Sequence, residues 1–180
     1  MEVNVGSRPI GLASSNPAKL AYATDRLADE HEQLRRQLRS LEASAKEVSW
    51  IDDTAEGMHI LQDLRRKAAH FEEELERHAA WEEQELYPFL INYFHSQQAP
   101  TIMPSFWVLE KDHQLGVSFL HSFKEAVVDI TPIFNKKQLT ETASYLLQAC
   151  LILNDHLTME EQFVLPLTDR VLMDLESFFS

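Results

Sequence analysis

Two stretches decide the fold: HAAWEEQELYP at residues 78–88 and HLTMEEQFVLP at residues 156–166. Both read His, three residues, Glu-Glu-Gln, three residues and Pro. A His and a Glu four positions apart lie one turn apart on the same face of an α-helix. The repeat therefore predicts two helices, each presenting an imidazole and a carboxylate side by side.

The apolar residues around these stretches keep a helical period, which predicts four long helices. Proline or a capping residue marks several of the expected ends. The first helix should run from Asn16 and Pro17 to about Val48, the second from Asp53 or Thr54 to Pro88, the third from about 102–105 to Ile130, and the fourth from about Gln138 to Leu165.

Helices of roughly 30 residues would each be about 45 Å long. Short connections make neighbouring helices antiparallel. We therefore expect an all-α, up-down-up-down antiparallel four-helix bundle over residues 16–180, preceded by an irregular N-terminal arm at residues 1–15. The stretch TDRVLMDLESFF, which follows Pro166, predicts a short extra helix at the C-terminus.

The composition agrees with a helical single-domain protein and excludes several kinds of partner. The chain has 180 residues, of which 44% are hydrophobic and only four are glycine. Its formal net charge of −13 disfavours binding to nucleic acid, and no basic membrane-binding face is evident. The longest nearly apolar stretch, YLLQACLIL, is too short to span a bilayer. A single cysteine, Cys150, fits a reducing compartment, so we expect a cytoplasmic protein.

Polar residues occupy the centre of the apolar helical stripes. Each long helix turns one histidine inward, and the second and fourth helices add a glutamate one turn later. Burying two carboxylates is costly without a positive partner, and no Lys or Arg lies centrally on these stripes. Histidine nitrogens and carboxylate oxygens are ligands for iron, manganese or zinc, and six of them exceed the four of a tetrahedral zinc site. We expect two metal ions held by His31, His78, Glu82, His113, His156 and Glu160.

Other histidines serve as a comparison for this interpretation. The pairs His70/Glu74 and His121/Glu125 have the same spacing, but they lie off the apolar stripes and lack the following Glu-Glu-Gln and Pro. We therefore predict that these two histidines, like His59 and His95, lie at the surface. A lone inward histidine is usually a hydrogen-bonded core residue, and this is the alternative for His31 and His113.

The combined pattern resembles the hemerythrin-like, or HHE cation-binding, domain over about residues 20–170. It is carried by DEH ending at His31, EKDH ending at His113 and the two repeated stretches. The resemblance implies a non-haem, oxo- or hydroxo-bridged di-iron centre with Glu82 and Glu160 as bridging carboxylates. It also implies an interaction with O2, NO or peroxide. The same nitrogen and oxygen ligands would accept manganese or zinc as substitutes.

The chain departs from the oxygen-carrying hemerythrins in two places. Those proteins have a second histidine one turn after the third-helix histidine, where this chain has Val117. They also end with His-x-x-x-x-Asp rather than His-x-x-x-Glu. The set of four His and two Glu is more similar to bacterial HHE proteins and to the di-iron domain of proteins that repair damaged iron centres. Those repair proteins carry an N-terminal cysteine-bearing domain that has no counterpart in these residues.

Three functions remain open from the sequence, and a non-catalytic metal- and gas-binding protein is the favoured one. The alternatives are a di-iron enzyme or repair protein, and a helical interaction module that binds little metal. Neither the physiological ligand nor the oligomeric state follows from the sequence. Acidic residues adjoin the expected ligands, and for most of them we predict a solvated position rather than a hydrogen bond to a ligand: Glu30, Glu83, Asp112, Asp155 and Glu161.

Overall fold

The structure, a computed structural model, describes residues 17–96, 102–130 and 134–178. The expected N-terminal arm and the cap at Asn16 lie outside these residues. Within them the chain is helical, with no strand. The elements are α1 (Pro17–Val48), α2 (Thr54–Trp81), the π-helix η1 (Glu82–Leu86), α3 (Tyr87–Ser96), α4 (Met103–Asp129) and α5 (Lys136–Phe178).

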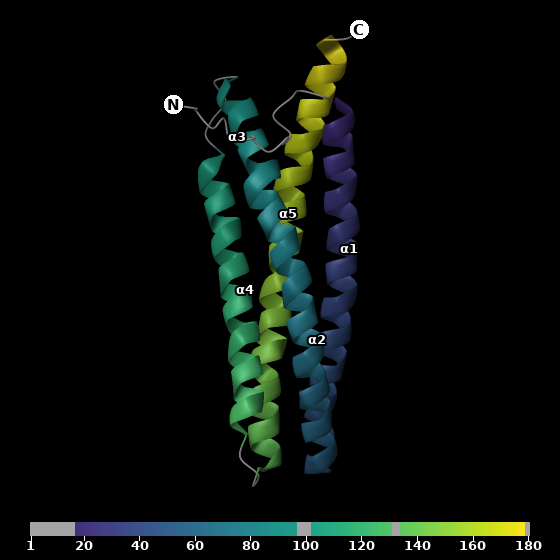
Figure 1. The fold of residues 1–180 in the computed structure, drawn as a ribbon, viewed down its shortest axis with the longest axis vertical. Coiled ribbons are helices and arrows are strands. Elements are labelled where there is room, and N and C mark those ends of the chain that lie inside the picture. Colours follow the sequence, from purple (N-terminus) through teal and green to yellow (C-terminus); the bar gives the residue numbers. More distant parts are fainter. Residues whose placement is uncertain (1–16, 97–101, 131–133, 179–180) are drawn as a thin grey trace, which may run out of the picture.

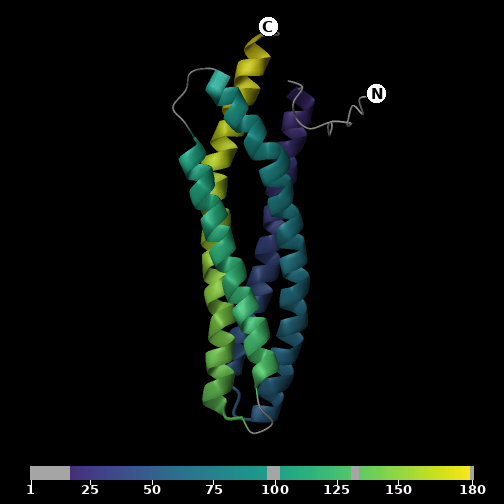
Figure 2. The same ribbon diagram turned by 60° about the vertical axis from the view of Figure 1, so that its left-hand side comes forward.

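Four long rods lie side by side in both views of the ribbon (Figures 1 and 2). The helix α1 packs against α2 and α5, while α4 packs against α5 and α2. The last turns of α1 and α4 and the first turns of α2 and α5 all lie at the lower end of Figure 1, away from the C-terminus. The predicted antiparallel four-helix bundle is therefore confirmed.

Side chains cap two of the helices. The Asp53 carboxylate accepts a hydrogen bond of 2.8 Å from the backbone N–H of Ala55, so Asp53 is the N-cap of α2. Before α5, the amide oxygens of Asn135 and Gln138 accept reciprocal 3.0 Å bonds from each other's backbone N–H groups. These bonds satisfy N–H groups that lack partners at a helix N-terminus.

The second rod does not end at Pro88, although the sequence predicted an end or a kink there. Instead the chain widens into the π-helix η1 and then continues as α3. In η1 the N–H of Tyr87 donates to the carbonyl of Glu82, five residues earlier. Proline has no N–H and its ring clashes with the carbonyl four residues before it. We attribute the wide turn to Pro88, because it moves that carbonyl away from the ring while the helix continues.

The fourth rod likewise runs through Pro166, so the separate extra helix expected at the C-terminus was wrong in one respect. That segment is helical, but it continues α5 without a break to Phe178. Val171 and Leu175, beyond the proline, are buried against the bundle, and this packing outweighs the lost hydrogen bond. Despite the 43 residues of α5, no described helix is long and apolar enough to cross a membrane.

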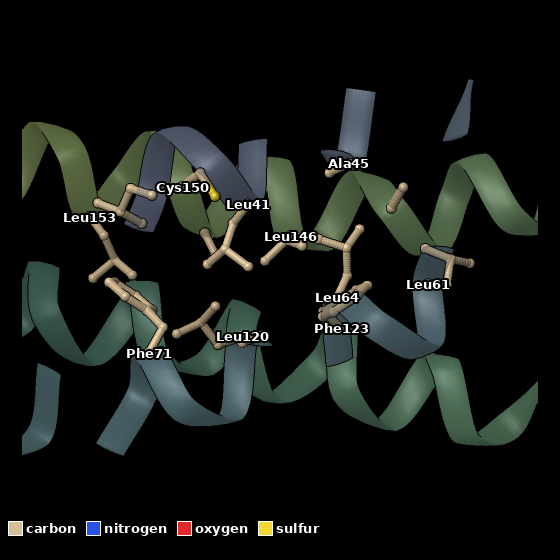
Figure 3. Close-up of a cluster of buried hydrophobic side chains, with 14 of the residues drawn as sticks. Leu41, Ala45, Leu61, Leu64, Phe71, Leu120, Phe123, Leu146, Cys150 and Leu153 are labelled. Carbon is tan, nitrogen blue, oxygen red and sulfur yellow. The ribbon is translucent and has the colours of Figure 1, made fainter. Parts of the chain in front are cut away.

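The buried apolar residues form two separate clusters along the bundle. One contains Phe71, Leu120 and Leu153, which point toward one another in Figure 3. The other, nearer the C-terminus, contains Leu27, Tyr87 and neighbours from α3, α4 and α5. Between the two clusters lies a layer of buried polar side chains: His31, His78, Glu82, His156 and Glu160. This polar layer is the candidate functional site.

Cys150 belongs to the first cluster and should be chemically silent. Its side chain is 4% exposed, and burial raises the pKa of its thiol to about 12. Because the thiolate is the reactive form, we expect no labelling by an aromatic disulfide reagent in the native protein and one thiol per chain in guanidinium chloride. Rapid labelling of the native protein would show that the cluster is open at α5.

Candidate metal centre

Four side chains from α1, α2, η1 and α5 converge within the polar layer. They are His31 of α1, His78 of α2, Glu82 at the start of η1 and Glu160 of α5, and all are buried. One potential ligand atom from each lies within 4.8 Å of the other three. The Nε2 atoms of His31 and His78 are 3.0 Å apart, and Glu82 Oε1 lies 2.9 Å from His78 Nε2. Glu160 Oε2 lies 3.4 Å from His31 Nε2.

The orientation of the two imidazoles makes this convergence a candidate cation site. Nδ1 of His31 donates a 3.0 Å hydrogen bond to Glu161, and Nδ1 of His78 donates one of 2.7 Å to Glu30. A neutral imidazole with a proton on Nδ1 has a lone pair on Nε2. Both Nε2 atoms would therefore direct lone pairs toward the glutamate oxygens, and only a positive charge between them relieves the repulsion.

Without a metal, protons supply part of that charge. Burial opposes protonation of His31, but Glu160 and Glu82 outweigh it and raise the pKa of His31 to about 9. Burial likewise opposes protonation of His78, yet Glu82 and Glu30 raise its pKa to about 10. These shifts favour positively charged imidazoles at neutral pH, so a metal ion that binds here replaces protons.

The pKa values of the two glutamates shift in opposite directions, although burial raises both. Burial and the nearby Glu82 carboxylate raise the pKa of Glu160 to about 7. Burial also acts on Glu82, but His78 and His31 outweigh it and lower the pKa of Glu82 to about 2. Glu82 Oε1, Glu160 Oε2 and Nδ1 of His156 accept or donate no hydrogen bond among the described residues. Buried polar atoms without partners fit a site built for a metal with nitrogen and oxygen ligands.

His113 and His156, the other two expected ligands, face each other beside this group. Their ring centroids are 5.8 Å apart in an edge-to-face arrangement between α4 and α5. His156 Nε2 lies 3.6 Å from Glu160 Oε2, so Glu160 lies between the two histidine pairs. His113 is half-buried, and burial lowers the pKa of both rings, that of His156 to about 4. The structure thus gathers the six predicted residues in one layer, with His113 and His156 outside the tight group of four.

Two of the acidic neighbours bond to rings of the expected ligands, against our expectation of a solvated position. Glu30 accepts from His78 and is paired with Arg26 at 2.7 Å, while Glu161 accepts from His31 and is paired with Arg35 at 3.0 Å. Each glutamate contacts the histidine of a neighbouring helix, so spacing within one helix could not reveal it. The other three, Glu83, Asp112 and Asp155, make no hydrogen bond to a ligand ring within the described chain.

Tyr87 is a site residue that sequence reasoning missed. Its hydroxyl lies 3.3 Å from Glu82 Oε2 and donates to Glu160 Oε1, and its ring stacks on Phe106 at 4.3 Å. Tyr87 follows Glu82 by five residues, which is one turn of a π-helix rather than of an α-helix. The only sequence signal for that turn is Pro88.

The remaining histidines lie where the sequence places them. His59, His70, His95 and His121 are exposed. Val117, which stands where the oxygen carriers have a further histidine, is half-buried and packs against the first apolar cluster. It therefore supplies no ligand to the polar layer.

Comparison with protein families agrees with this geometry. The model of the Hemerythrin family, described as the hemerythrin HHE cation binding domain, matches residues 22–168. The match covers most of the described helices and all six inward His and Glu residues. No curated protein and no solved structure matches the chain.

Proposed function

Since this chain belongs to the hemerythrin HHE cation-binding family, we propose that it binds a non-haem di-iron centre in its polar layer. Through that centre it would interact with O2, NO or peroxide in sensing, storage, detoxification or iron handling. The observation that carries the proposal is the pair of buried carboxylates, Glu82 and Glu160, with no lysine or arginine against them among the described residues.

The ligand set favours two ions over one. His31 and His78 form one pair of imidazoles, and His113 and His156 form a second pair beside Glu160. Each carboxylate has two oxygens and so can join two metal ions. Six nitrogen and oxygen donors suit iron, and they would also accept manganese.

The surrounding residues would keep the site dry and accessible only to small molecules. The layer lies between two apolar clusters, and the Tyr87 hydroxyl donates to Glu160 and lies 3.3 Å from Glu82 Oε2. The iron pair would supply redox chemistry and an open coordination position, because Val117 adds no ligand. The protein residues orient the carboxylates and imidazoles and exclude bulk water.

The first test is the metal content of protein purified from iron-supplemented cells. We expect about two iron atoms per chain by plasma mass spectrometry, because the six donors form two groups that share Glu82 and Glu160. Anaerobic ferrous protein should then change its visible spectrum on exposure to O2 or NO.

Two results would contradict the proposal separately. Less than half a metal atom per chain after anaerobic ferrous reconstitution would contradict the metal centre itself. Full iron loading with a spectrum unchanged by O2, NO and peroxide would contradict the gas or peroxide interaction while leaving the metal centre intact.

A further inference from the structure

The two histidine pairs differ in what holds their outer nitrogens. His31 is bonded through Glu161 to Arg35, and Arg35 also donates to Asn154 at 3.0 Å and to Thr158 at 3.2 Å. His78 is bonded through Glu30 to Arg26, whose guanidinium lies 4.1 Å from the centroid of the Trp81 ring. Both chains of contacts run from a ligand ring to a partly buried arginine on α1.

The second pair has no such support. Nδ1 of His156 has no hydrogen-bond partner, and no hydrogen bond to the His113 ring exists among the described residues. The acidic neighbours of these two, Asp112 and Asp155, do not reach either ring. The sequence repeat suggests two equivalent halves, but the structure supports only one of them with charge-assisted hydrogen bonds.

From this difference we propose that the two metal positions are unequal. The position formed by His31, His78, Glu82 and Glu160 would be filled first and hold its ion tightly. The position formed by His113 and His156 together with the shared glutamates would be filled second and would release its ion readily. The inference rests on the proposed metal-binding function and adds an order of loading and loss to it.

The physical reason lies in the orientation of the rings. A histidine whose outer N–H is bonded to a carboxylate has a fixed tautomer and ring angle and a more basic inner nitrogen. Loss of such a partner costs about 10- to 100-fold in metal affinity. The position with two supported rings should therefore have a metal affinity at least about 10-fold higher than the position with none. Arg35 is in this view a positioning residue, which acts on the metal through Glu161 and His31.

The test follows the release of Fe²⁺ from the loaded full-length protein to a coloured ferrous chelator under anaerobic conditions. Wild-type protein is expected to release one iron in a fast phase and one in a phase slower by about 10-fold or more. His156→Ala should remove the fast phase and keep the slow one. His121→Ala, an exposed histidine on α4, is the control and should leave both phases unchanged.

A second variant separates positioning from stability. Arg35→Met should accelerate the slow phase by about 10-fold and leave the fast phase alone, whereas Arg36→Met, at the exposed neighbouring position, should change neither. If Arg35 acts through Glu161, adding Arg35→Met to Glu161→Gln should cause little further acceleration. A merely structural role would instead lower the melting temperature and accelerate both phases alike.

The outcomes distinguish this inference from the function beneath it. Wild-type protein that binds no iron would contradict the proposed function. Two irons that leave in a single phase would contradict unequal positions. An Arg35→Met protein with the wild-type slow phase would contradict the positioning role of Arg35. Both results would leave the di-iron centre intact.

Discussion

Replacement of both His78 and Glu82 by alanine is expected to abolish metal binding and the stability that metal confers. His78 and Glu82 both belong to the group of four, and His78 Nε2 lies 2.9 Å from Glu82 Oε1. In wild-type protein, free metal at about 100 times its dissociation constant should stabilise the fold by about 2.7 kcal/mol. For a chain of this size that raises the melting temperature by roughly 5–10 °C. The double variant should melt at the same temperature with ferrous iron and with chelator.

The matched control is the pair His121 and Glu125, which has the same spacing in α4. Both side chains are more than half exposed, at 63% and 64%. Their replacement by alanine should leave the iron content and the metal-dependent melting shift unchanged. A double His78/Glu82 variant that still gains stability from iron would place the metal elsewhere in the molecule.

Gly116→Val is expected to destabilise the bundle by about 3 kcal/mol, whether or not metal is bound. Gly116 is buried in α4, and a Cβ atom there would lie 2.4 Å from Cδ2 and 2.5 Å from Cγ of Leu153 in α5. Leu153 is fully buried and cannot swing away without displacing its neighbours in the first cluster. Urea unfolding followed by circular dichroism at 222 nm would measure the loss.

A second glycine provides the contrast. At Gly57 in α2 a Cβ would meet only the end of the Leu139 side chain, at 2.9 Å, and that methyl group can shift. Gly57→Ala should therefore be neutral or stabilising, because alanine in a helix is favoured over glycine by about 1 kcal/mol. Shortening the opposing residue with Leu153→Ala should recover part of the stability lost in Gly116→Val. If Gly116→Val folds as stably as wild type, α4 and α5 are not in close contact at this level.

The glycine contact also affects the site. His113 lies one turn before Gly116 in α4, and His156 lies one turn after Leu153 in α5. Because the helices are antiparallel, the glycine contact and the pair of histidine rings, 5.8 Å apart, are adjacent levels of one interface. Separation of the helices at Gly116 would therefore widen the His113/His156 pair.

The sequence was sufficient to predict the helices, the bundle and the polar layer, because helical periodicity states directly which side chains face inward. It also identified Asp53 as a capping candidate, because capping depends only on residues that are close in the sequence. It was insufficient at Pro88 and Pro166. A proline is a strong local signal to stop, but the buried residues beyond each proline stabilise a continuous helix, and that packing is not local.

The parts of the site that depend on a single helix could be predicted from the sequence. Inward-facing His and Glu residues could be read one helix at a time. The hydrogen bonds from His78 to Glu30 and from His31 to Glu161 cross between helices, so they depend on the relative rotation and height of two rods. Tyr87 depends on the extra residue in the π-helix turn, which rotates everything after it by about 100°.

The division of the apolar interior into two clusters has a consequence for how the protein unfolds. Unfolding spreads as a single event through continuous packing, and a polar layer is where that continuity is interrupted. An ion bound there would link α1, α2 and α5 within the polar layer. The two apolar clusters would then unfold as one unit only while the ion is bound. Resistance of the protein to proteases would then rise with the fraction of chains that hold the ion.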